Sequence, residues 1–158
     1  MNCKKLPVGA WIACCAAVLV LVSLIVYAIN IGSEGYFQGA SISNLVLFLI
    51  LAIICELVAV VLGRLEQKGA VGKVLDLIAG ACRIVAPALI ALCLINLIAA
   101  RVEGLGFIYF SNADVAKEVQ TPANLSSATG SIAAMVCLGV SMLAAIVAAF
   151  ANVRKKEA

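Results

Sequence analysis

The sequence predicts an all-α fold, a four-helix transmembrane bundle of a multi-pass integral membrane protein. Of the 158 residues, 65% are hydrophobic and only 12% are charged, whereas a soluble domain has about 45–50% apolar and about 25% charged residues. The apolar residues gather into four long runs separated by shorter polar segments. Lys and Arg concentrate in alternate polar segments, which is typical of a chain that crosses a membrane repeatedly.

The four apolar runs are the predicted spans, at approximately 8–29, 45–63, 74–100 and 131–153. An α-helix needs about 20 residues to cross a hydrocarbon core of about 30 Å, so each run is close to the required length. The first run follows a basic start, as in a signal peptide. It is longer than the usual apolar region of about 7–15 residues, and no clear cleavage site follows it. We therefore expect it to be retained as a span.

The polar segments form two predicted outer loops, 30–44 and 101–130, and one inner turn, 64–73. Ser111 to Asp114 resembles a capping box and predicts a short helix within the second loop. Thr121 and Pro122 then have the residue types of a helix N-cap and first turn. The last helix is therefore expected to begin in water, ahead of its span.

The distribution of basic residues predicts the topology. The inner turn and the two chain ends carry Lys4, Lys5, Arg64, Lys68, Lys73, Arg154, Lys155 and Lys156. The two outer loops carry only Arg101 and Lys117. Because Lys and Arg accumulate in cytoplasmic segments, we expect a protein of the cell (cytoplasmic) membrane with both termini in the cytoplasm.

The two halves of the chain share an order of features that suggests a 2+2 internal repeat. In each half a Glu-Gly pair follows the first span, and aromatic residues come soon after it. The aromatic residues are Tyr36, Phe37, Phe107, Tyr109 and Phe110, which are our candidates for contacts on the outer face. A duplication predicts that the two segments lie side by side. The alternative is that any four-span protein with glycine-rich outer turns would show this order.

Two charged residues inside the apolar runs are the main candidates for an intramembrane polar site. Glu56 lies in the second span and Arg83 in the third, and each alone would cost about 2.5–3.5 kcal/mol on insertion scales. We expect them to meet at similar depth as an ion pair. A structural pair that fixes helix register is favoured over a carboxylate that couples to protons or ions. Asp76 at the mouth of the third span and Asn96 within it complete the candidate site.

Composition argues against several classes of enzyme. The chain has no His, which disfavours zinc hydrolysis and imidazole acid–base catalysis. Six of the seven Cys lie in apolar runs and none in the outer loops, so a disulfide framework is not expected. We also find no phosphate-binding glycine loop, nucleophile elbow or metal-spaced cluster. We therefore expect no enzyme, no cofactor and no metal site.

The remaining function classes are those of a membrane protein whose specific role the sequence does not name. The first expectation is a non-enzymatic accessory or scaffold protein, embedded in the lipid bilayer, with a membrane-protein partner or a second copy of itself. The alternative is a small oligomeric transporter or channel that uses Glu56 and Arg83. Nothing in the sequence indicates nucleic acid binding.

Overall fold

The fold is all-helical in a computed structural model that describes residues 7–64 and 70–151. These residues form five helices and no strand. The helices are α1 (Val8–Gly32), α2 (Leu45–Leu62), α3 (Ala70–Phe110), α4 (Ala113–Val119) and α5 (Pro122–Phe150). All but α4 are long and apolar enough to cross a membrane. The predicted fold class is therefore confirmed.

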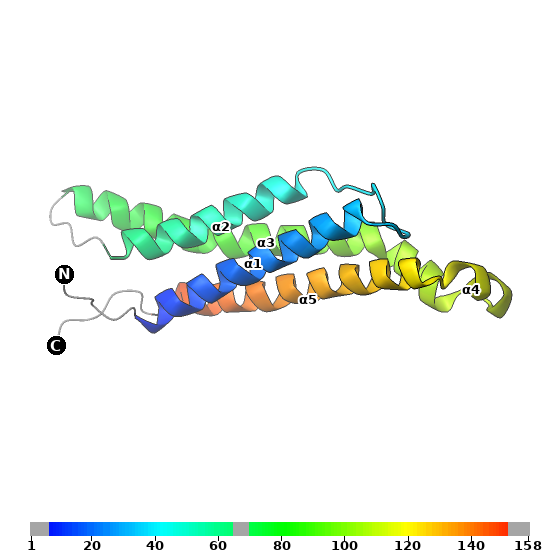
Figure 1. Ribbon diagram of the computed structural model, residues 1–158. Helices are drawn as coiled ribbons and strands as arrows, with labels where there is room; N and C mark the ends of the chain where they lie inside the picture. Colours follow the sequence, from blue (N-terminus) through cyan, green and yellow to red (C-terminus); the bar gives the residue numbers. More distant parts are fainter. Residues whose placement is uncertain (1–6, 65–69, 152–158) are drawn as a thin grey trace.

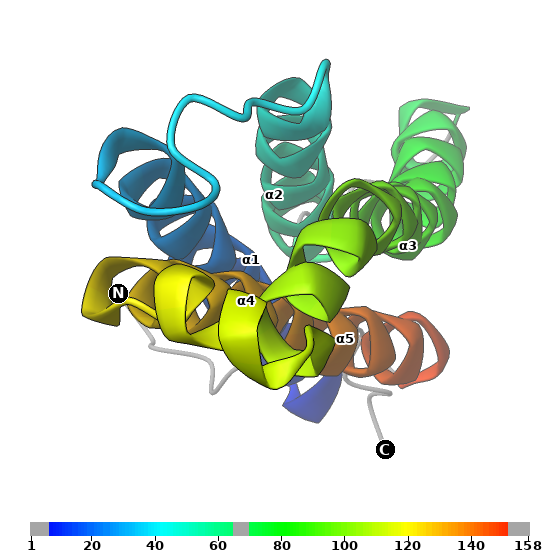
Figure 2. The same cartoon turned by 90° about the vertical axis from the view of Figure 1, so that its right-hand side faces the viewer.

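The four long helices form an elongated bundle (Figure 1). Helix α1 packs against α5 and α2, and α3 packs against α2 and α5. At one end, which we call the terminal end, α1 begins beside the end of α5, since a Cβ atom on Gly9 would lie 3.0 Å from that of Ala151. Segment 33–44 and helix α4 lie at the other end, which we call the loop end (Figures 1 and 2).

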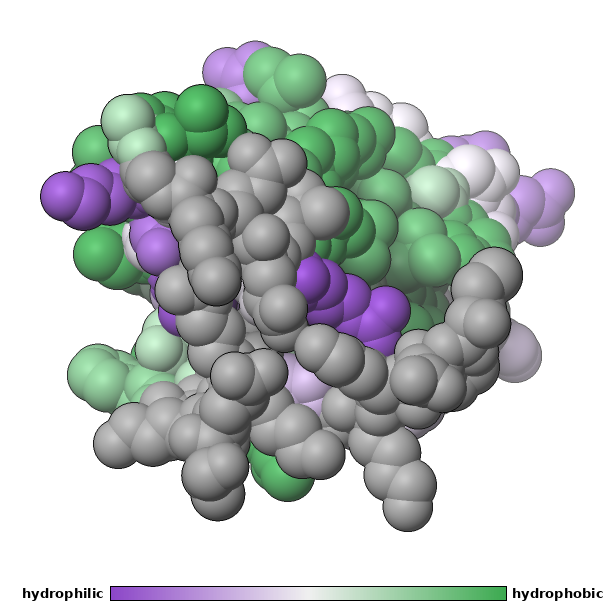
Figure 3. Space-filling model, turned by 90° about the vertical axis from the view of Figure 1, so that its left-hand side faces the viewer, coloured by the Kyte–Doolittle hydropathy of each residue, from purple (hydrophilic) through white to green (hydrophobic). Residues whose placement is uncertain are grey.

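Small residues occupy many of the positions where the helices meet, and large apolar residues cover the outside of the bundle. Ala16, Ala52 and Ala86 are fully buried, and such residues let membrane helices approach closely. In contrast, Leu77 and Ile84 are 74% and 73% exposed. Hydrophobic residues also cover much of the surface visible from the terminal end (Figure 3). This distribution is the one expected of helices that face lipid.

Helix α3 extends well beyond its predicted span, which ended at residue 100, and continues to Phe110. The sequence suggested a loop here because Arg101 introduces a charge and two glycines follow it. In the structure, Arg101, Gly104 and Ile108 are buried on one side of the continuing helix, at the spacing of one helical face. Segment 33–44 covers Arg101 and Gly104, and burial of this face accounts for the additional turns.

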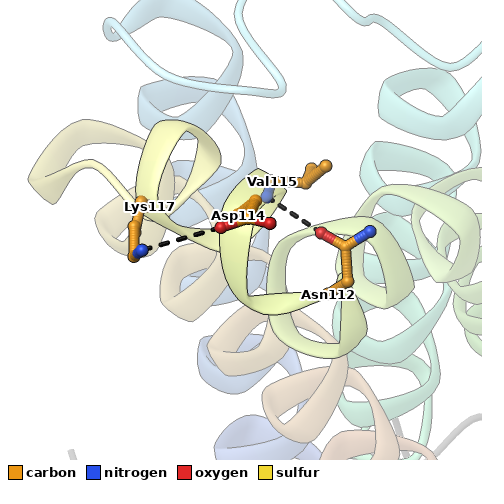
Figure 4. Close-up of polar contacts among 4 residues, drawn as sticks. All are labelled: Asn112, Asp114, Val115 and Lys117. Carbon is orange, nitrogen blue, oxygen red and sulfur yellow. Dashed lines mark hydrogen bonds and ion pairs between the residues drawn. The ribbon is translucent and has the colours of Figure 1, made fainter.

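The two predicted helix starts at the loop end are present, with one difference. Helix α4 is capped by Asn112, whose side-chain oxygen accepts a hydrogen bond from the Val115 amide at 3.0 Å (Figure 4). The expected capping residue, Ser111, instead donates to the Phe107 carbonyl. Helix α5 begins as predicted, because the Thr121 hydroxyl accepts from the Asn124 amide at 3.2 Å.

Most of the basic residues behind the topology prediction lie outside the described residues. These are Lys4, Lys5, Lys68, Arg154, Lys155 and Lys156. Of the predicted inner turn 64–73, the structure describes Arg64 and the residues from Ala70 onward, which already belong to α3.

Candidate functional site

The best-defined polar structure in the bundle fastens segment 33–44 to the loop end. The amide of Ile42 donates a hydrogen bond to the Tyr27 hydroxyl of α1 at 2.7 Å. The guanidinium Nη2 of Arg101, on α3, donates to the Ala40 carbonyl at 2.6 Å. The amide of Gly39 donates to the carbonyl of Ile31 at 2.8 Å. The amide of Phe37 donates to the Ser127 hydroxyl of α5 at 3.2 Å. The segment is thus held from three helices, α1, α3 and α5.

Arg101 is the centre of this structure and is only 2% exposed. Its guanidinium carbon lies 4.5 Å from the ring centroid of Phe37 and 5.9 Å from that of Tyr27, within the range of cation–π attraction. Its Nε atom is buried without a hydrogen-bond partner. No carboxylate among the described residues pairs with it. The Arg101 guanidinium, which was predicted to lie in an outer loop, therefore contacts two aromatic rings and one backbone carbonyl.

The two Glu-Gly-aromatic segments meet next to Arg101. The ring centroids of Tyr36 and Phe37 are 5.2 Å apart in an edge-to-face arrangement, and Tyr36 lies 6.0 Å from Phe107. A Cβ on Gly104 would come within 2.6 Å of both the Tyr36 and the Phe37 ring. The side-by-side placement predicted by the repeat hypothesis is present. One segment is helical and the other is not, so the duplication itself stays a prediction.

Four of the five aromatic candidates for the outer face are exposed, and one is buried. Phe37 is only 3% exposed and belongs to the packing around Arg101, so its assignment as a contact residue was wrong. The others are at least 40% exposed: Tyr36, Phe107, Tyr109 and Phe110. Phe110, the last residue of α3, is 88% exposed.

A set of buried polar contacts joins α1 to α5, and the sequence analysis did not identify it. The Asn30 amide nitrogen donates to the Ser127 carbonyl at 2.6 Å, and the Ser131 hydroxyl donates to the Asn30 amide oxygen at 3.2 Å. Farther along, Ser23 donates to the Ala134 carbonyl and Ser141 to the Ala16 carbonyl. Such bonds contribute about 0.6 kcal/mol each on average in membrane bundles.

Glu56 and Arg83 line the same small cavity but do not form the predicted ion pair. Glu56 is 4% exposed, and neither an ion pair nor a hydrogen bond to it occurs within the described residues. The Nε atom of Arg83 is likewise buried and without a partner. The cavity has a volume of about 10 Å³ and is otherwise lined by alanines and Val60, which leaves space for about one water molecule. Glu56 and Arg83 thus lie at similar depth on the same cavity without a direct ion pair.

The other two members of the predicted intramembrane site lie elsewhere. Asp76 is exposed on α3 and is not part of the cavity lining. Asn96 is also exposed, and it makes none of the hydrogen bonds found among the described residues. Of the four candidates, only Glu56 and Arg83 line the same cavity.

Comparisons with known proteins add no information about this arrangement. No protein-family model, no curated protein and no solved structure matches the chain. Among the described residues there is also no group of three or more His, Cys, Asp or Glu side chains that could hold a metal ion. Any functional conclusion must therefore come from the geometry of the chain itself.

The separation of Glu56 from Arg83 leads to a stability prediction. Glu56→Gln is expected to leave the thermal stability in detergent unchanged or raised, because a buried carboxylate without a hydrogen-bond partner is itself unfavourable. A double-mutant cycle with Arg83→Gln should give a coupling energy near the lower end of the range of about 0.5–3 kcal/mol for side chains that share a cavity, because no ion pair or hydrogen bond joins the two. A loss of stability in Glu56→Gln that the double variant partly recovers would show that the two charges pair directly.

Proposed function

We propose that this chain is a non-enzymatic accessory or scaffold protein of a membrane, which binds a membrane-protein partner through its loop end. The observation that carries the proposal is the buried Arg101. Its contacts with Ala40 and Phe37 hold segment 33–44 against α3. A fixed surface suits binding, because little conformational freedom is then lost when a partner docks.

The surface that this structure presents is aromatic. Phe107 and Phe110 lie three positions apart on α3 and therefore share a helix face; they are 44% and 88% exposed. Tyr109 and Tyr36 add two further exposed rings at the same end. Aromatic side chains are enriched in protein interfaces and among the residues that carry most of the binding energy.

The packed interior supports a binding role over conduction by a single copy of the chain. The cavity beside Glu56 accommodates about one water molecule. Toward the loop end, the core between the helices is filled by large side chains such as Leu49, Ile90 and Leu138, which are fully buried. A path for a solute would require these helices to move apart.

A second candidate function is a small oligomeric transporter or channel. It is favoured by one observation, the buried carboxylate of Glu56 that borders a cavity together with Arg83. Ionisable residues within membrane spans frequently mark ion or proton pathways. Flux into liposomes that Glu56→Gln abolishes would support this candidate over the accessory role.

We further infer that the protein resides in the cell membrane with both termini in the cytoplasm. An even number of spans would leave both chain ends on one side of the membrane, and the bias of Lys and Arg toward these ends and the central turn supports the cytoplasmic side. In a cysteine-free variant, a cysteine introduced by Ser111→Cys should react with an impermeant thiol reagent added outside intact cells. Labelling only after the cells are opened would reverse the topology.

A matched pair of phenylalanines tests the proposed binding surface. Phe110 and Phe150 are both 88% exposed, and they end α3 at the loop end and α5 at the terminal end. Phe110→Ala is expected to weaken co-purification of the partner by about tenfold or more, as for a central interface residue. Phe150→Ala should leave it unchanged. If neither variant changes co-purification, the exposed rings at the loop end contact lipid and not protein.

A further inference from the structure

A second polar site is a pocket between the end of α1 and the start of α5, two helices that pack against each other (Figure 1). Its volume is about 170 Å³, enough for a group of several heavy atoms where one water needs about 10–15 Å³ by the same measure. Gly130 lets the Asn30 side chain lie against α5 at one wall of the pocket, because a Cβ there would lie 2.7 Å from the Asn30 amide nitrogen.

The polar lining of the pocket is rich in hydrogen-bond acceptors. Glu34 supplies the one charged side chain of the lining, and Asn30, Ser33, Ser126 and Ser127 supply amide and hydroxyl oxygens. Asn30 and Ser127 are 7% and 5% exposed. The Asn30 amide oxygen accepts a hydrogen bond from the Ser131 hydroxyl, and the Ser127 hydroxyl accepts one from the Phe37 amide. These bonds fix both side chains before a ligand arrives, and each oxygen keeps a second lone pair that can accept from a ligand.

This lining selects among charged groups. A carboxylate with no Lys or Arg in the lining disfavours an anion and favours a cation. No aromatic ring lines the pocket, whereas quaternary ammonium groups are usually bound by aromatic cages. A primary ammonium instead carries three N–H donors, which the oxygens of Glu34, Asn30 and the serines can accept.

The position of the pocket identifies the source of the ammonium. The wall of the pocket nearer the terminal end is apolar and consists of Val26 and Ile29, the latter 61% exposed. The wall nearer the loop end is polar and lies where segment 33–44 follows α1. This junction of apolar and polar surface lies at the level of lipid headgroups. We propose that the pocket binds the ammonium of a phosphatidylethanolamine headgroup, with Glu34 as its counter-charge.

Lipid retention by the purified full-length chain tests this assignment. The protein is stripped of lipid in mild detergent and offered phosphatidylethanolamine, phosphatidylcholine and phosphatidylglycerol with identical acyl chains, and bound lipid is counted by native mass spectrometry. We expect the ethanolamine lipid to be retained about tenfold better than the choline lipid. Equal retention of these two, or preference for the glycerol lipid, would overturn the proposal without any variant.

Two charge-removing variants locate the preference. Glu34→Gln should abolish the selectivity for phosphatidylethanolamine, whereas Glu103→Gln should preserve it, since Glu103 is an exposed carboxylate outside the pocket lining. Selectivity that survives in Glu34→Gln would contradict the proposal. Phosphoethanolamine without acyl chains should fail to displace the lipid at equal concentration. If it displaces the lipid, the site is one for a soluble amine.

Discussion

Replacing Arg101 with alanine is expected to release segment 33–44 and to lower the free energy of unfolding by about 2 kcal/mol. The variant loses a charged hydrogen bond to Ala40, worth about 1.5–3 kcal/mol, and a cation–π contact with Phe37, worth about 2 kcal/mol when desolvated. Relief of the cost of burying the guanidinium offsets part of this loss. Hydrogen exchange of the amides of residues 36–44 should rise strongly.

Two further arginine variants make this result interpretable. Arg101→Lys keeps the charge but loses the planar group that stacks on a ring, so it should recover only part of the stability. Arg64→Ala removes an exposed arginine at the terminal end and should change stability by less than about 0.5 kcal/mol. Unchanged exchange of segment 33–44 in Arg101→Ala would show that Arg101 does not hold it.

Gly35→Ala is expected to be at least as disruptive, by about 3 kcal/mol. The φ angle of Gly35 is +145°, a conformation that costs other residues about 1–3 kcal/mol. A Cβ there would also lie 2.7 Å from the Ser127 Cβ and 2.8 Å from the Ala123 carbonyl oxygen, and overpacking of this kind adds about 1–3 kcal/mol. The effect should appear as a lower melting temperature in detergent.

Two other glycines separate the two causes. Gly39 has a φ of +71° but nothing within 4 Å of an added Cβ, so Gly39→Ala should cost only about 1–2 kcal/mol of backbone strain. Gly106 is helical and also faces open space, so Gly106→Ala should be neutral or stabilising by up to about 1 kcal/mol. Equal melting temperatures for Gly35→Ala and Gly39→Ala would mean that the contact with α5 is not tight.

The fold could be predicted because its signals are long and local. Each of the four spans is a run of about 20 apolar residues, and such a run in a membrane has few structural choices besides a helix. The start of α5 was also predictable, since Thr121 caps the helix by accepting a hydrogen bond from the amide of Asn124, three positions later. The end of α3 was not, because the burial of Arg101 and Gly104 depends on a segment about 60 positions earlier in the chain.

The candidate sites were harder to predict than the fold, because they depend on contacts between segments that are distant in the sequence. Glu56 and Arg83 could be placed at similar depth from helix geometry, but whether their side chains touch depends on helix rotation, which periodicity does not determine. The hydrogen bond of Asn30 to α5 and that of Ser141 to α1 were not predicted. An isolated polar residue at the end of a span, or among alanines within one, also occurs on exposed helix faces. Polar residues in two spans indicate a hydrogen bond between them only when it is known that the two spans pack against each other.

Native mass spectrometry of the wild-type protein, extracted from its own membrane in a mild detergent, tests the central claim most directly. The account predicts a defined complex with another membrane protein, because the loop end presents a fixed aromatic surface built around Arg101. The same spectrum identifies the partner by its mass. A monomer, or a homo-oligomer without any other protein, would contradict the accessory role. The homo-oligomer would instead direct liposome flux assays toward Glu56.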